Sequence, residues 1–256
     1  MKSTSDSLVI IPTYNEKENI ILIVEAVFSL PKNFDILIVD DSSPDGTAEI
    51  VKRLQERFNE PSVTRLHLLQ RQVKQGLGTA YIAGFKYGLH NGYKFILEMD
   101  ADFSHDPKEL VNLYMSCAVG GQDLTIGSRY ITGVNVVNWP IGRVLLSYFA
   151  SSYVRLITGM SIRDTTAGFV CYRRKVLETL RLDEVTFVGY AFQIEMKFLS
   201  WKYGFKLKEV PIIFTERTRG QSKLSAGIFK EAFFGVIQMT ITSWFKKYSR
   251  VPESHE

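Results

Sequence analysis

The chain has 256 residues, of which 45% are hydrophobic and 23% are charged, and its formal net charge is +4. This composition is typical of a globular protein, and the length suits one large α/β domain or two small ones. The charge is too small for a dedicated nucleic-acid-binding protein with dense basic stripes, so we expect no nucleic-acid partner. Cys117 and Cys171 belong to no CxxC motif, which argues against a disulfide, zinc or redox role.

No apolar segment predicts a signal peptide or a membrane span. Residues 1–6 are polar and run directly into a predicted strand. A spanning helix needs about 20 apolar residues. The nearest approach, residues 227–245, is interrupted by Lys230, Glu231 and Gln238. We therefore expect a cytoplasmic protein that does not cross a membrane by itself.

Short apolar runs alternate with amphipathic stretches through the first half of the chain. Strands are predicted at residues 8–11, 34–39, 63–69, 95–99 and 124–127, and helices at 16–30, 45–58, 78–90 and 108–119. Strict alternation predicts an α/β fold with a mostly parallel sheet and helices on both faces. Beyond Tyr130 the pattern is a helix at 141–157, a mixed region up to 211, an amphipathic helix at 225–248 and a disordered tail at 249–256.

Polar residues follow four consecutive predicted strands, in the loops 12–16, 40–47, 75–81 and 100–102. In a parallel sheet these strand ends form the ligand-binding edge. Any one loop could serve as a turn or a helix cap, but four aligned loops indicate a binding site. The first loop lacks GxGxxG and no GxxxxGK[ST] occurs, so the usual dinucleotide and P-loop sites are excluded.

The apolar run that begins at Tyr93 ends abruptly in Asp100 and Asp102. Two carboxylates this close repel each other, and a divalent cation is the usual remedy. A strand end that opens into a turn also favours aspartate. With Mg²⁺ or Mn²⁺, the pair would suit a bound diphosphate, and Asp41 would suit hydrogen bonding to a ribose or a base.

The motifs PTYNE, DDSSPDGT, GLGTAY, MDADFSHDP, GSRY and ERTRGQSKL follow one another between Leu8 and about Leu224. In this order they resemble the family 2 glycosyltransferases of the GT-A (Rossmann-like) fold, and within that family the members that make dolichyl or polyprenyl phosphate mannose. The resemblance implies an inverting transfer of mannose from GDP-mannose to a polyprenyl or dolichyl phosphate. It also implies one domain at 1–224, with a nucleotide-sugar half at about 1–128 and an acceptor half at about 129–224.

The resemblance also implies roles for single residues. The nucleotide sugar would contact Pro12, Tyr14, Glu16, Val39, Asp41, Ala101, Arg217 and Lys223. Asp100 and Asp102 would hold Mg²⁺ or Mn²⁺, and the acceptor phosphate would contact Arg129, Arg143 and Ser147. The implied catalytic set is Asp100, Asp102, Arg129, Arg217 and Lys223, the last two from the RxxGxSK motif. Ser104 stands where some relatives carry glutamine, which leaves the third protein ligand of the metal open.

Several of these residues also fit plainer roles. Arg143 could be a surface charge on an amphipathic helix, and the cations from Arg217 to Lys223 could belong to a solvated loop. His105 suits a turn or a place behind the metal ligands better than direct ligation. Glu195 could orient the site or solvate a helix face.

The expected nucleophile is the lipid phosphate itself. Its second pKa of about 6 leaves it largely ionised at neutral pH, so no general base is required. The C-terminal helix carries Phe229, Phe233, Val236, Ile237 and Trp244 near one face and is followed by Lys246, Lys247 and Arg250. This pattern suits an interfacial helix on the cytoplasmic membrane face and equally a helix packed on the domain. The sequence does not decide whether a small membrane subunit is a partner.

Three alternative functions compete with mannosyl transfer. UDP-glucose or another nucleotide sugar could be the donor. Transfer to a saccharide or protein hydroxyl would need a general base, and the QxxRW motif of processive family members is absent. The third alternative is a non-catalytic subunit that binds a sugar nucleotide. The intact acidic pair and the intact cations argue against it.

Overall fold

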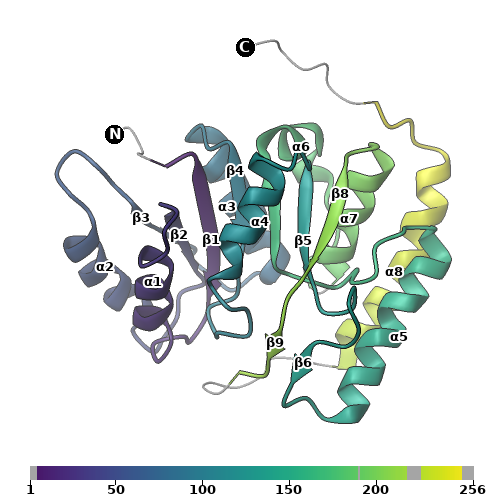
Figure 1. The fold of residues 1–256 in the computed structure, drawn as a ribbon, viewed down its shortest axis with the longest axis horizontal. Helices are drawn as coiled ribbons and strands as arrows, with labels where there is room; N and C mark the ends of the chain where they lie inside the picture. Colours follow the sequence, from purple (N-terminus) through teal and green to yellow (C-terminus); the bar gives the residue numbers. More distant parts are fainter. Residues whose placement is uncertain (1–4, 190, 218–225, 250–256) are drawn as a thin grey trace.

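The computed structural model describes residues 5–189, 191–217 and 226–249 (Figure 1). Seven strands of the described chain form one sheet in the order β3-β2-β1-β4-β7-β5-β8. They are β1 (Ser7–Thr13), β2 (Asp35–Asp40), β3 (Leu66–Gln70), β4 (Phe95–Glu98), β5 (Leu124–Ser128), β7 (Val170–Arg173) and β8 (Leu207–Pro211). Neighbours are parallel except at β7, which runs antiparallel between β4 and β5.

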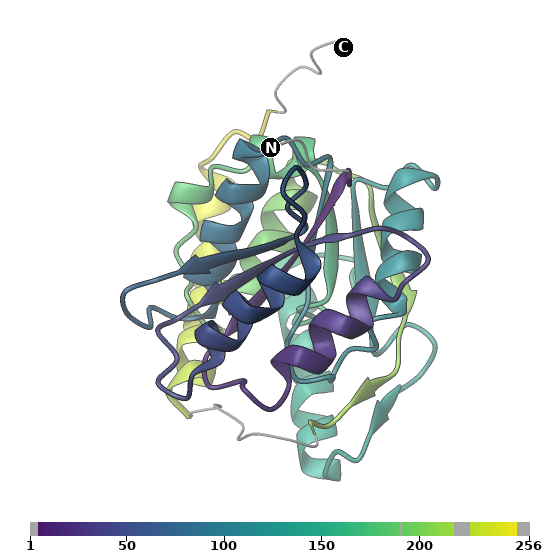
Figure 2. The same ribbon diagram turned by 90° about the vertical axis from the view of Figure 1, so that its left-hand side faces the viewer.

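Helices cover both faces of this sheet (Figures 1 and 2). One face carries α1 (Ile20–Phe28), α2 (Thr47–Phe58) and α4 (Glu109–Ala118). The other carries α3 (Leu77–His90), α6 (Arg174–Thr179) and α7 (Ala191–Lys202), with α5 (Ile141–Thr158) and α8 (Ala226–Trp244) packed at one end. In β1, Leu8 and Ile10 enter one apolar cluster, whereas Val9 and Ile11 enter the other. This alternation is the two-residue period of a strand buried on both sides.

The predicted α/β fold with a mostly parallel sheet is confirmed. The first helix begins at Ile20 rather than at 16, because the Glu16 carbonyl accepts hydrogen bonds from the amides of Asn19 and Ile20 in a turn. The mixed region contains structure that the periodicity did not indicate. Besides β7, it holds the short 3₁₀ helix Leu182–Glu184, and β9 (Phe214–Thr215) pairs in parallel with β6 (Val136–Val137).

The C-terminal helix α8 packs on the molecule along one face and leaves another exposed. Val236, Thr240 and Ser243 are nearly buried against the neighbouring helices, and α8 contacts both α5 and α7. Val236 therefore points inward, away from exposed Phe233 and Trp244, with which the helical pattern had grouped it. The side chain of Phe229 lies outside the described part. None of the described helices is long and apolar enough to cross a membrane.

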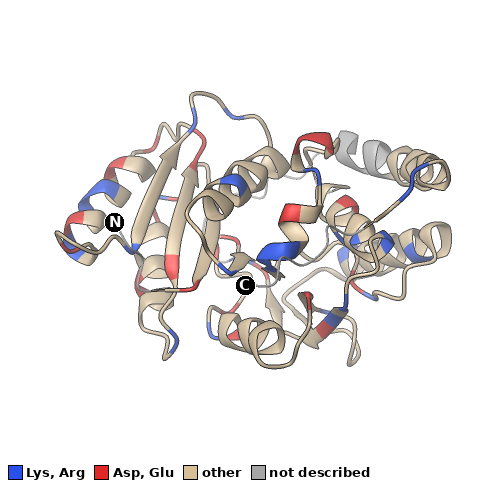
Figure 3. Ribbon diagram, turned by 90° about the horizontal axis from the view of Figure 1, so that it is seen from above, with Lys and Arg blue, Asp and Glu red and all other residues tan. Residues whose placement is uncertain are grey.

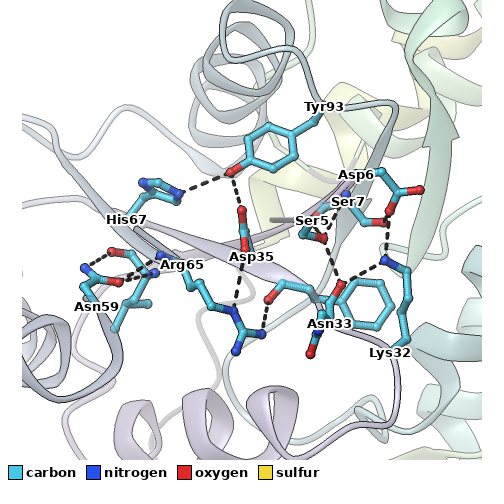
Figure 4. A network of polar contacts seen from close by, with 12 residues as sticks. Ser5, Asp6, Ser7, Lys32, Asn33, Asp35, Asn59, Arg65, His67 and Tyr93 are labelled. Carbon is cyan, nitrogen blue, oxygen red and sulfur yellow. Dashed lines mark hydrogen bonds and ion pairs between the residues drawn. The ribbon is translucent and has the colours of Figure 1, made fainter. Parts of the chain in front are cut away.

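A network of polar side chains connects β2, β3 and the residues before β4 at the amino-terminal ends of these strands (Figure 4). Buried Asp35, the first residue of β2, accepts a 2.8 Å hydrogen bond from the Tyr93 hydroxyl, and Arg65 Nε lies 3.8 Å from the same carboxylate. Because the Tyr93 proton goes to Asp35, its oxygen accepts from His67 Nε2 at 3.2 Å. Tyr87 then donates to His67 Nδ1 at 2.9 Å. The network therefore holds His67 in one neutral tautomer.

Candidate active site

A cavity of about 830 Å³ opens at the carboxyl ends of the parallel strands. Residues from all four polar loops line it, as the topology requires. Among the predicted site residues that the structure describes, Val39 alone does not line the cavity, since its side chain is fully buried in the core between β2 and α3. Lys223 lies outside the described residues. The other predicted residues converge on this one space.

The Asp100–Asp102 loop forms the acidic wall of the cavity. Asp102 is nearly buried, and its Oδ1 accepts a 3.0 Å hydrogen bond from the backbone amide of Ser104. The side chain of Asp100 is 38% exposed. Desolvation in the cleft and the neighbouring charge of Asp102 raise the pKa of Asp100 to about 7. A carboxylate whose ionisation is disfavoured by a neighbouring carboxylate suits a shared divalent cation.

His105 lies behind the acidic pair. Its ring stacks on Phe169 with centroids 4.7 Å apart, and its Nδ1 lies 4.0 Å from Asp100 Oδ2 without a hydrogen-bond partner among the described residues. Burial lowers the pKa of His105 to about 4, so the imidazole is neutral at pH 7. The described residues contain no group of three acidic, His or Cys side chains arranged around a metal. A pair of carboxylates nevertheless fits Mg²⁺ or Mn²⁺, which commonly completes its shell with water and substrate phosphate.

Asp41, the predicted nucleotide contact, is already held by a cation that the motif analysis did not identify. Arg71 grips its carboxylate with two hydrogen bonds of 2.5 and 2.7 Å and donates a third, of 2.7 Å, to the Thr79 hydroxyl. Arg71 directly follows β3, so its strand-end position was the available signal. The bidentate contact fixes Asp41 at the cavity wall and leaves its remaining lone pairs for a ligand.

The glycine-rich turn before α3 packs against a second loop of the cavity, which contains Val188. Gly76 adopts a φ of +102°, and a Cβ there would lie 2.9 Å from the carbonyl oxygen of Val188. The Gly78 amide donates to the same oxygen at 2.9 Å. From the other side, nearly buried Glu195 accepts the amides of Thr186 and Phe187, each at 2.9 Å. Glu195 thus positions a cavity loop rather than solvating a helix face.

Arg129 is anchored by a buried carboxylate. Its guanidinium donates to Asp164 at 2.7 and 2.6 Å and to the Thr166 hydroxyl at 2.8 Å, and its backbone amide donates to the same aspartate at 2.9 Å. Asp164 is fully buried. Although burial opposes its ionisation, the charge of Arg129 lowers the pKa of Asp164. The sequence analysis did not identify Asp164, which lies on the segment leading into β7.

The remaining predicted cations also carry partners. Arg143 donates to Glu216 at 2.6 Å and lies 4.3 Å above the ring of Trp139, so it belongs to the cavity wall rather than to an isolated surface. Arg217 pairs with Asp102 at 2.6 Å. Ser147 accepts a 2.8 Å hydrogen bond from the Tyr130 hydroxyl. Its own hydroxyl proton can still be donated to a ligand.

The cavity changes character toward α5 and α8. Its wall there is largely apolar and includes Leu146, Phe149, Tyr153, Ile194 and Phe233. Phe149 is 62% exposed, so the apolar wall continues onto the molecular surface. The acidic pair, the polar strand-end pocket and the paired arginines give this cavity the chemistry to bind a phosphorylated ligand together with a divalent cation.

Comparison with known proteins identifies the family. Residues 8–181 match Glycosyl transferase family 2, and the chain belongs to this family. It is 46% identical to polyprenol monophosphomannose synthase of Mycolicibacterium smegmatis over 241 residues, which cover 94% of this chain and 89% of that protein. It is 44% identical to undecaprenyl-phosphate mannosyltransferase of Micrococcus luteus over 229 residues, with 90% and 91% covered. The family indicated by the motifs is therefore confirmed.

A solved structure supports the fold. Glucosyl-3-phosphoglycerate synthase of Mycobacterium tuberculosis, in complex with Mn²⁺, UDP-glucose and phosphoglyceric acid, aligns with a TM-score of 0.66 over 97% of this chain and 81% of that one. The sequence identity is 14%. At that distance the likeness concerns the fold, and the GT-A-like architecture expected from the motifs is confirmed.

Proposed function

We propose that this protein transfers mannose from GDP-mannose to a polyprenyl phosphate and inverts the anomeric centre. The observation that carries the proposal is one continuous cavity with an acidic, arginine-lined end and an apolar end that reaches the surface at Phe149. A phosphate ester of a long hydrocarbon matches both ends. The names of the two relatives point to the same pair of sugar and lipid.

On this proposal the nucleotide sugar occupies the loops after β1, β2 and β4. Pro12, Tyr14, Glu16 and the anchored Asp41 contact the nucleotide, and Asp100 and Asp102 hold Mg²⁺ or Mn²⁺ beside the diphosphate. The bound ion supplies neutralisation of the charge that develops on the departing diphosphate. Lys223, from the RxxGxSK motif, is proposed as a further contact of the donor phosphates.

The acceptor phosphate is proposed to lie between Arg129, Arg143 and Ser147. Arginine binds phosphate oxygens with paired hydrogen bonds, and positioning of an already ionised nucleophile supplies much of the catalysis. The buried, neutral His105 is not needed as a base because the phosphate carries no proton that must be removed. The hydrocarbon then follows the apolar wall of α5 toward a membrane surface.

The test is an incubation with radiolabelled GDP-mannose or UDP-glucose, polyprenyl phosphate and Mg²⁺ or Mn²⁺. We expect a lipid-linked product from GDP-mannose only, lost on chelation of the metal and restored by adding it back. Asp102→Asn should reduce transfer more than about 100-fold, because a carboxylate ligand is removed while the side-chain shape is kept. A lipid product from UDP-glucose alone would overturn the donor, and a product only on water-soluble hydroxyls would overturn the acceptor.

A further inference from the structure

Residues 214–217 cross the mouth of the cavity as a strap with a fixed backbone. The amide of Thr215 donates to the carbonyl of Ser104 in the metal loop at 3.1 Å. The next amide, that of Glu216, donates to Val137 in β6 at 3.1 Å. The main chain is therefore tied to the acidic wall on one side and to β6 on the other, whereas the side chains of Glu216 and Arg217 are held by ion pairs.

The adjacent side chains of Glu216 and Arg217 form ion pairs with different parts of the cavity wall. Glu216 Oε1 lies 2.6 Å from Arg143 NH1, and Arg217 NH2 lies 2.6 Å from Asp102 Oδ2. Each contact occupies a group that the proposed reaction requires, Arg143 for the acceptor phosphate and Asp102 for the metal. A carboxylate of the protein thus contacts the arginine proposed for the phosphate, and a guanidinium contacts the aspartate proposed for the metal.

The pair between Arg143 and Glu216 is accessible enough to exchange. Each of its side chains is 32% exposed, whereas the anchor of Arg129, Asp164, is fully buried and makes three hydrogen bonds with that arginine. Exposed ion pairs contribute little stability, so a competing anion can displace Glu216 at small cost. A phosphate monoester brings nearly two negative charges and three acceptor oxygens, against one charge and two oxygens of the carboxylate.

We propose that Glu216 occupies the acceptor phosphate's place on Arg143, so that an acceptor binds this arginine only after it displaces the carboxylate. The inference rests on the proposed function, since it assumes a lipid phosphate acceptor. A hydroxyl carries no charge and gains little from Arg143, whereas a phosphate ester gains a charged partner. Because the cost of displacing Glu216 is the same for every ligand of Arg143, removing the charge of Glu216 strengthens the binding of each phosphate ester by the same factor.

The test compares Glu216→Gln with Glu178→Gln. Glu178 makes a matched ion pair with Arg174, also at 2.6 Å and partly exposed, on α6 and away from the cavity. Binding of a short-chain isoprenyl monophosphate and of its methyl diester is measured by calorimetry with GDP present. For Glu216→Gln we expect about three-fold tighter binding of both esters, an unchanged monoester-to-diester ratio and a lower acceptor KM, whereas Glu178→Gln should match the wild type.

The outcomes separate this inference from the proposed function. If the wild type binds the monoester and Glu216→Gln binds it equally or more weakly, the competition is overturned while the lipid phosphate acceptor stands. If the wild type binds neither probe, the proposed acceptor is wrong and the inference fails with it. Equal thermal midpoints of the two variants exclude a folding effect, and Glu216→Asp, which keeps the charge, should restore the weaker monoester affinity of the wild type.

Discussion

Most of the charged residues that line the cavity lie in ion pairs of opposite sign. The four pairs are Arg71–Asp41, Arg129–Asp164, Arg143–Glu216 and Arg217–Asp102. Over the whole chain, too, acidic and basic residues are interspersed along the ribbon (Figure 3). These four pairs therefore contribute little net charge to the cavity, and a phosphate-bearing substrate must break pairs or bring a metal ion with it. Burial decides which pairs can break.

The buried pair of Arg129 and Asp164 should contribute to stability as well as to binding. Asp164→Ala leaves a nearly buried guanidinium without its carboxylate, which typically costs about 3–5 kcal/mol. We expect a lower free energy of unfolding by urea denaturation and a raised acceptor KM with little change for the donor. The double variant Arg129→Met with Asp164→Leu should recover part of the stability and none of the transfer. Recovery of both would contradict the assigned role of Arg129.

His67 should make the protein acid-sensitive. Burial lowers the pKa of His67 to about 4 in the folded state, from 6.5 for the free side chain. Between these pH values the unfolded chain binds a proton that the folded chain does not, so stability falls as the pH falls from about 6.5 to 4. The loss is less than about 1.4 kcal/mol per pH unit because the side chain is partly exposed.

The measurement is the urea midpoint of wild type and His67→Gln at pH 7 and pH 5. Glutamine keeps a donor for Tyr93 and does not titrate. The wild type should lose more stability than the variant on acidification. Parallel losses would assign the acid sensitivity to other groups, of which His105 is the first candidate, since burial also lowers its pKa to about 4.

For each ion pair, the motifs predicted that one of the two residues belongs to the site, but they seldom predicted its partner. Asp41, Arg129 and Arg143 could be predicted because strand ends and family motifs mark them. Their pairing could not, because Asp164 meets Arg129 only through the turn into β7, and Glu216 meets Arg143 only through the pairing of β9 with β6. Such contacts join residues far apart in the sequence, so no local hydrophobic period predicts them.

At the scale of elements, α3 approaches the sheet through glycines. A Cβ on Gly84 would lie 2.7 Å from Ile10 Cγ2, and one on Gly88 would lie 2.7 Å from Ile96 Cδ1. The backbone of α3 therefore packs almost directly on β1 and β4, and this close packing fixes the position at which the helix presents Ala80 and Tyr81 to the cavity.

Two identical substitutions should have opposite effects. Gly84→Ala should destabilise the protein by about 1–3 kcal/mol, because overpacking against Ile10 outweighs the gain in helix propensity. Gly142→Ala, in α5, meets nothing within 4 Å and should stabilise by up to about 1 kcal/mol. Thermal midpoints of both variants check the prediction. If Gly84→Ala left the thermal midpoint unchanged or raised it, β1 would have to shift to make room for the added methyl group.

Most strands and helices could be predicted because their residues alternate or repeat locally. The four early strands lie in the predicted places, and their alternate residues enter the two cores. The place of β7 in the sheet escaped prediction because this strand enters antiparallel and out of chain order, between strands that precede it. Only long-range pairing, Cys171 with Leu97 on one side and with Thr125 on the other, defines its place.

At the scale of the whole molecule, exposed apolar side chains gather at the end formed by α5 and α8. They include Ile141, Phe149 and Leu156 on α5, and Phe234, Trp244 and the adjoining Phe245 at α8. Lys246 and Lys247 follow directly. An apolar ridge flanked by cations is typical of a surface that enters the headgroup region of an anionic bilayer.

We expect the protein to co-float with vesicles that contain an anionic lipid. The double variant Trp244→Ser with Phe245→Ser should weaken this binding at least about tenfold, because two large side chains no longer leave water. These residues are 70% and 85% exposed, so folding should not suffer. The control is Val119→Ser, 74% exposed and placed after α4 on another part of the surface. Equal flotation of all three proteins would contradict a membrane role for this end.

The inserted strand β7 also determines how the chain must be assembled during synthesis. The ribosome releases β1, β2, β3 and β4 first, and these can pair with one another as they emerge. It then releases β5, which adjoins them only through β7 and so must wait for its neighbour. Until then the edge of β4 is open to other nascent chains, since unpaired edges recruit foreign strands. The arrival of residues 170–173 closes that edge.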